Sequence, residues 1–251
     1  MSKLADLLKS SARAAPGALG FGASTPKKTA SMLLVALVGE RWARGSGEAV
    51  SAGADAVLLT GTPGEKELAA AVAAADSRPC GLLDPQADAK AIAALRKAGL
   101  DFLTLGAEAP ASALLDEKLA LLLHLNEELT DIELRTLDSL LLEAIYLERS
   151  SGPLTIRRQM ELRRVSGLAR TPLLLAVQSD IEEQELLSLR EAGVALVALD
   201  LSERGAADAL RRLRGVIDGL PSRRSRNDER GVVTIGQVTS AEPEEEEEEE
   251  E

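Results

Sequence analysis

Aromatic residues are scarce in this chain of 251 residues, which contains two phenylalanines, one tryptophan and one tyrosine. Because 45% of the residues are hydrophobic, the core must be built almost entirely from aliphatic side chains. Proteins that bind single-stranded nucleic acid stack the bases on aromatic side chains, so this scarcity argues against such a partner. The length is suited to one domain with one sizeable core.

Cysteine and long apolar runs are also rare. Cys80 is the single cysteine, which excludes an intramolecular disulfide and is typical of a reducing compartment. The longest apolar run, residues 32–38, is too short to cross a membrane. The first eleven residues lack the continuous apolar segment of an export signal. We therefore expect a soluble, cytoplasmic protein with no membrane partner.

Negative charge is concentrated at the C-terminal end. Of the formal net charge of −12, residues 222–251 contribute −7, mostly from the consecutive glutamates Glu244–Glu251. Like charges at this density repel one another and bury no apolar surface, so we predict a disordered acidic tail over residues 221–251. The tail could solvate the protein or contact a basic partner. The rest of the chain is only mildly acidic and should not attract nucleic acid.

Eight short apolar segments recur along the middle of the chain, at residues 32–38, 56–60, 80–83, 101–105, 119–125, 142–147, 173–177 and 194–199. Amphipathic stretches lie between or after most of them, at residues 65–74, 88–98, 130–137, 155–168, 181–192 and 203–220. Continuous aliphatic strands are typical of parallel sheets that are buried on both faces. The pattern predicts a (β/α)8 barrel over residues 31–220, preceded by an N-terminal cap over residues 1–30. An open, doubly wound sheet is the alternative.

A short phrase recurs where a predicted helix ends and a strand begins. Ala52-Gly53-Ala54-Asp55 leads into an aliphatic run, and similar phrases occur at residues 97–102 and 191–197. In this respect the chain resembles the aldolase-like and phosphate-binding TIM barrels, over roughly residues 30–218. The resemblance implies a TIM barrel with its ligand chemistry at the carboxyl ends of the strands. It is a degenerate likeness, without the catalytic signatures of those families.

The chain differs from those families in two respects: it lacks the glycines of a phosphate-binding site and a lysine placed for catalysis. The loops after the last two predicted strands begin with Gln178-Ser179-Asp180 and Asp200-Leu201-Ser202, where a phosphate site would need glycines and no acidic side chains. No lysine follows Lys118, which precedes its strand, so Schiff-base chemistry is not expected. Nucleotide-binding glycine motifs and zinc-binding motifs are also missing.

Polar side chains directly follow several predicted strands. Our candidate catalytic residues are the carboxylates Glu40, Asp84, Glu148 and Asp180, and our candidate ligand-binding residues are Thr60, Asn126 and Gln178. Convergent carboxylates could act as acid and base, or could bind a divalent metal ion, although no cofactor or specific metal site is identified. Acidic residues also favour the first turn of a helix, which is the structural alternative for each of them.

His124 is the single histidine and lies inside an apolar run. Alone it cannot form a histidine-rich metal site, and no local motif marks a nucleophile for it to activate. We therefore expect a barrel-lining or packed histidine.

Two functions fit these observations. The missing lysine and glycine signatures favour a barrel that binds a small molecule or serves as a scaffold without catalysis. The alternative is an enzyme of lyase, isomerase or hydrolase type, which would use carboxylates on a small metabolite at the carboxyl-end mouth of the barrel.

Overall fold

A computed structural model of the chain describes residues 2–13, 31–85, 89–116, 118–149, 152–203 and 205–221. The predicted acidic tail from residue 222 onward lies outside these residues. Within the described part, no helix has both the length and the apolar character needed to span a membrane.

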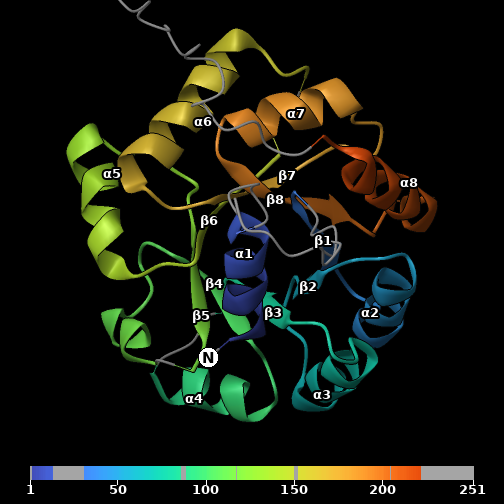
Figure 1. Cartoon of the computed structure of the whole chain (residues 1–251). Helices are drawn as coiled ribbons and strands as arrows, with labels where there is room; N and C mark the ends of the chain where they lie inside the picture. The colour runs from blue at the N-terminus through green and yellow to red at the C-terminus, as the bar shows by residue number, and fades with distance from the viewer. Residues whose placement is uncertain are drawn as a thin grey trace, which may run out of the picture.

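Eight parallel strands close into one barrel, in which each strand pairs with its neighbours in sequence and β8 pairs with β1 (Figure 1). Their bounds are β1 Leu33–Val38, β2 Ala56–Leu59, β3 Cys80–Leu83, β4 Phe102–Gly106, β5 Ala120–His124, β6 Ala144–Leu147, β7 Leu173–Ala176 and β8 Val194–Asp200. The pairing of β1 with β8 confirms the predicted (β/α)8 barrel. It excludes the open sheet, in which the two edge strands would not meet.

Helices surround this barrel (Figure 1). The outer helices are α2 Trp42–Ser51, α3 Glu65–Ala74, α4 Ala89–Lys97, α5 Asp131–Leu137, α6 Ile156–Ala169, α7 Glu183–Glu191 and α8 Ala206–Gly219, and the short 3-10 helices are η1 Ala111–Leu115 and η2 Asp138–Leu140. Helix α2 was not predicted, because Gly45 and Gly47 weaken its helical pattern. Gly45 has a packing role, since a Cβ at this position would meet the side chain of Val38 on β1.

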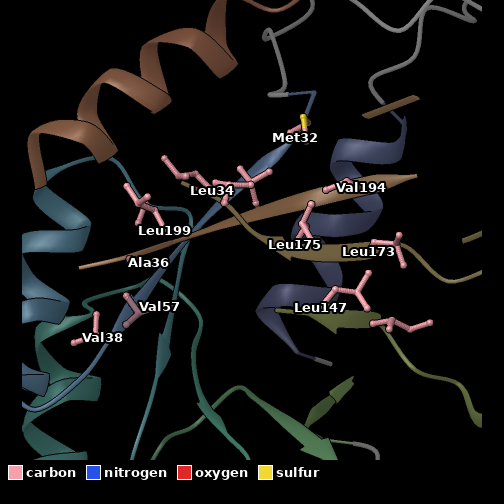
Figure 2. Packing of buried hydrophobic residues seen from close by; sticks show 14 of the residues in the cluster. Met32, Leu34, Ala36, Val38, Val57, Leu147, Leu173, Leu175, Val194 and Leu199 are labelled. Atoms are coloured by element: carbon pink, nitrogen blue, oxygen red, sulfur yellow. The ribbon is translucent and has the colours of Figure 1, made fainter. Parts of the chain in front are cut away.

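Alternating residues of each strand divide the core into two layers. On β1, the side chains of Leu34, Ala36 and Val38 belong to the outer layer between strands and helices, part of which Figure 2 shows. Leu33, Val35 and Leu37 belong to the layer inside the barrel. Both layers are almost entirely aliphatic, as the composition predicts.

Helix α1 (Lys3–Arg13) covers the N-terminal end of the barrel and lies within the ring of strands in Figure 1. Leu4 and Leu8 pack with the interior layer. The carboxylate of Asp101, directly before β4, accepts hydrogen bonds from the hydroxyl of Ser2 at 2.6 Å and from the backbone amides of Lys3 at 2.7 Å and Leu4 at 2.9 Å. The described part of the predicted N-terminal cap, residues 2–13, therefore consists almost entirely of this helix. The predicted cap segment around Leu19–Gly22 lies outside the described residues.

Candidate functional site

The strand register brings several polar side chains to the carboxyl end of the barrel interior. His124, the last residue of β5, stands beside Gly106 on β4 and Tyr146 on β6. Its parity along β5 is that of Leu122, which lies in the interior layer. His124 therefore points into the barrel, at the end where barrels of this type carry their chemistry.

Two carboxylates contact the imidazole of His124 from opposite sides. Nδ1 shares a hydrogen bond with Oδ2 of Asp84, which follows β3. Nε2 lies 3.3 Å from Oε1 of Glu148, which follows β6. The side chain of His124 is 6% exposed, whereas that of Glu148 is 68% exposed. A buried imidazole is thus connected to the open mouth through a carboxylate.

Asp84, which contacts His124, has an unusual backbone conformation. Its φ of 43° lies in the left-handed region, which costs on the order of 1 kcal/mol or more for a residue with a Cβ. The strand hydrogen bonding ends here, with the amide of Asp84 donating to the carbonyl of Thr104. The carboxylate orients the ring and determines which nitrogen carries a proton, because a carboxylate accepts and Nδ1 must donate.

Tyr146 packs beside His124, with the two ring centroids 5.1 Å apart and the planes inclined at 48°. Burial is the main cause that raises the pKa of the Tyr146 hydroxyl to about 12, and the negative charges of Glu148, Asp200 and Asp84 contribute to the same rise. Tyr146 is therefore a neutral phenol at physiological pH. The immediate surroundings of Tyr146 therefore contain three carboxylates.

Three polar atoms at this end are buried without a hydrogen bond among the described residues. The Oγ1 atom of Thr104, the Oδ1 atom of Asp84 and the Nε2 atom of His124 have no hydrogen bond there. Such atoms are costly to bury, so their clustering on neighbouring strands marks a place where polar groups are kept for a purpose other than stability.

The loops above the strands are connected across the mouth. Arg149, after β6, forms a 3.3 Å ion pair with Glu203, after β8. The amide of Ser202 donates to Oδ1 of Asp200 at 2.8 Å. Asp200 lies where a phosphate-binding barrel would present backbone amides to its ligand.

Two of the four predicted carboxylates, Asp84 and Glu148, come together around His124. Glu40 and Asp180 are exposed in the loops after β1 and β7, and neither is bonded to another candidate in the described residues. Among the predicted ligand-binding residues, Thr60 lies at the end of β2, where its carbonyl accepts from Nε1 of Trp42. Asn126 is exposed after β5, and Gln178 is half-buried after β7.

The sequence analysis did not select His124, Tyr146, Thr104 or Asp200 as site residues. A signal was present, because His124 and Tyr146 fall on the inward-facing parity of two strands, close to their carboxyl ends. The continuous apolar run of residues 119–125 concealed this parity. The expectation that His124 lines the barrel is confirmed.

Metal binding by convergent carboxylates was one possibility raised by the sequence. Among the described residues, no group of three or more His, Cys, Asp or Glu side chains is arranged to hold a metal ion. The arrangement at His124 explains why: Asp84 and Glu148 contact different ring nitrogens and do not converge on one point.

Comparison with known proteins gives structural relatives but no sequence relatives. The sequence matches no protein-family model and no curated protein. In structure it resembles 3-keto-L-gulonate-6-phosphate decarboxylase from Vibrio cholerae, with a TM-score of 0.61 and 14% identity over 76% of this chain and 99% of that one. It also resembles a mutant tryptophan synthase alpha-subunit from Pyrococcus furiosus, with a TM-score of 0.60 and 14% identity over 75% and 98%.

The chain has the TIM-barrel fold. At this level of identity the likeness to solved structures concerns the fold alone, so the chemistry must be argued from the residues at the mouth.

Proposed function

We propose that this protein is an enzyme that moves a proton on a small metabolite at the mouth of the barrel, in a reaction of lyase or isomerase type. The observation that carries the proposal is the chain of contacts Asp84–His124–Glu148, which links a buried imidazole to an exposed carboxylate at the carboxyl end of the strands. Such linked groups are typical of general acid–base catalysis.

In this proposal Glu148 is the catalytic residue, because its exposed carboxylate can touch a substrate. It takes a proton from a carbon or hydroxyl group of the substrate. His124 is a positioning residue that accepts that proton on Nε2 or returns it, while Asp84 holds the ring in place. The neutral Tyr146 hydroxyl can donate a hydrogen bond toward negative charge that develops on the substrate.

The likeness to phosphate-binding barrels does not extend to this site. Asp84, Glu148 and Asp200 give the described part of the mouth a negative potential, and a phosphate group would be repelled. We therefore propose a substrate without a phosphate group.

Hydrogen exchange with solvent tests the proposal across a range of possible substrates. The protein is incubated in D2O with a panel of oxo acids, hydroxyketones, aminoketones and aldoses, and proton NMR follows the replacement of carbon-bound hydrogen by deuterium. We expect exchange in at least one compound, slowed about 100-fold or more in Glu148→Gln and in His124→Asn. Glu65→Gln, on an outer helix, is the matched control and should keep the full rate.

Two results would overturn the proposal. One is a panel in which no compound exchanges faster than in buffer. The other is an exchange rate in His124→Asn equal to that of the unaltered protein, because the imidazole would then have no part in the proton transfer.

A barrel that binds a small molecule without converting it is the second candidate. It is favoured by the burial of Nε2 of His124, which leaves the imidazole little exposed surface for direct contact with a substrate. Saturable ligand binding in a thermal-shift screen, together with no deuterium exchange in the same ligand, would support this function over the enzymatic one.

A further inference from the structure

A second feature of the molecule adjoins the Asp84–His124–Glu148 chain. A cavity of about 280 Å3 lies between the ends of β5 and β6 and the helices α5 and α6. This volume is near the lower limit for a small-molecule site, so the cavity is suited to one part of a ligand. Glu148 lines the cavity and also contacts His124, so this one residue borders both the cavity and the buried imidazole.

The lining combines an apolar floor with an acidic rim. Leu134 and Leu162 are fully buried at the floor, and Val165 is half-buried beside them. Glu127 and Glu128 are exposed in the loop after β5. A group that fills the cavity would therefore bury aliphatic surface and present its outer end to carboxylates.

The two arginines of the lining do not neutralise this rim. Arg158 forms a 3.3 Å ion pair with Glu161. Arg164 forms a 2.7 Å ion pair with Asp131 and donates a hydrogen bond to the carbonyl of Leu129 at 2.8 Å. Within the described residues, Glu127 and Glu128 have no ion pair, and the rim has an excess of negative charge.

Glu148 is the residue that lies between the cavity and the imidazole of His124. The imidazole of His124 is more than nine-tenths buried, and its Nε2 atom is directed at Glu148 without a hydrogen bond among the described residues. A substrate that reaches the carboxylate of Glu148 would have its remaining part over the cavity.

We propose that this cavity is the substrate subsite for an aliphatic ammonium group, so that the substrate is a small amine. The alkyl portion packs on Leu134, Leu162 and Val165, and the ammonium group binds the carboxylates of Glu127 and Glu128. This inference rests on the proposed function in one respect, because the bound amine is a substrate only if the protein is an enzyme. The binding of the amine itself does not depend on catalysis.

Methyl NMR on the full-length protein tests the subsite. The probe is n-butylammonium, compared with n-butanol and butyrate, which have similar alkyl groups and different charges. The methyl signals of Val165, assigned from the Val165→Ala spectrum, report on the cavity, and those of Val216 on α8 report on a surface outside it. A local readout is needed because Glu244–Glu251 would attract the same cation.

We expect n-butylammonium to shift the Val165 signals saturably, with a dissociation constant about tenfold lower than that of n-butanol, while butyrate has no effect. The double variant Glu127→Gln/Glu128→Gln should lose most of this preference. Glu65→Gln/Glu183→Gln changes the net charge equally on other helices and should leave it intact. His124→Asn should still bind the amine, which separates this test from that of the proposed function.

The subsite is overturned if the Val165 signals do not respond to n-butylammonium. It is also overturned if n-butanol or butyrate binds as tightly, or if the double variant binds like the unaltered protein. Amine binding without deuterium exchange in any compound would contradict the proposed enzymatic function and leave the subsite standing.

Discussion

The ring of Phe102 on β4 occupies the space in which a Cβ of Gly81 on β3 would stand. The two residues are partners in the strand register, and Cζ of Phe102 lies only 2.6 Å from the position of such a Cβ. Phe102 is fully buried inside the barrel and is the largest side chain there with no exposure. The barrel thus accommodates the ring of Phe102 by leaving the neighbouring position on β3 without a side chain.

Gly81→Ala should therefore destabilise the protein by about 1–3 kcal/mol, the usual cost of adding a methyl group to a packed core. Urea unfolding measures the loss. In Gly81→Ala/Phe102→Leu the smaller side chain makes room, so the double variant should cost less than the sum of the two single variants. Additive costs would show that the two residues do not compete for space.

Asp101 should anchor helix α1 to the bottom of the barrel. Asp101→Ala removes the acceptor of three hydrogen bonds at the start of α1 and should cost about 2 kcal/mol. Amide hydrogen exchange should show faster exchange in residues 3–13 and little change in the strands. Asp101→Asn keeps one acceptor oxygen and should lose less. Unchanged protection of α1 in Asp101→Ala would contradict this role.

Asp55, the last residue of the phrase Ala52-Gly53-Ala54-Asp55, has a structural role. Its carboxylate accepts from the amide of Leu34 at 2.8 Å and from Arg214 of α8 at 2.7 Å. Asp55→Ala leaves the buried amide and the guanidinium without this acceptor, so we expect a loss of about 2–3 kcal/mol in urea unfolding. Arg214→Met keeps an apolar side chain of similar length and leaves the hydrogen bond from the Leu34 amide to Asp55 in place, so it should lower the stability by only about 1 kcal/mol. Equal losses would show that the amide contributes nothing.

Tyr146, the single tyrosine, reports on the charges at the mouth. Its pKa of about 12 lies above the ordinary value of about 10. The ultraviolet absorbance of tyrosinate should therefore appear near pH 12 in the folded protein and near pH 10 in denaturant. Burial is the larger cause, so Glu148→Gln should lower the folded pKa only in part. A normal pKa in the folded protein would contradict the buried, negatively charged environment.

The same pKa predicts how stability depends on alkaline pH. Between about pH 10 and pH 12 the folded protein keeps the Tyr146 proton that the unfolded chain has released, so stability falls as the pH rises through this range. Tyr146→Phe should have a shallower loss over the same range, measured by urea unfolding at each pH. Cys80, whose pKa burial raises to about 12, contributes a loss of the same sign in both proteins.

Local patterns in the sequence predicted most helices and strands, because neighbouring residues largely determine where such an element forms. The bounds of β3 and α3 agree with the prediction, and the other strands differ by at most two residues at an end. A capping box starts α5, with reciprocal hydrogen bonds between Thr130 and Glu133. Helix α2 was missed because two glycines interrupt its local pattern, and only the structure shows that one of them, Gly45, is explained by contact with β1.

The candidate site was predictable only in part. Asp84 and Glu148 follow their strands directly, which brought them into the candidate set, as it did Glu40 and Asp180. The closed barrel distinguishes Asp84 and Glu148 from the other two candidates, because it brings only Asp84 and Glu148 into contact with His124. Asp84 and Glu148 lie 40 and 24 positions away from His124 in the chain. A local sequence pattern spans only a few residues, so it cannot predict which carboxylates contact this histidine.

The sequence by itself determined the order of strands and helices, the aliphatic nature of the core and the absence of the common phosphate and lysine signatures. These follow from hydrophobic periodicity and residue type, which act locally. Only the tertiary structure decided that the sheet closes, that α1 covers its lower end and that His124 lies between two carboxylates. The physical reason is that register and barrel closure bring together side chains from different strands, and burial then makes their few polar contacts decisive.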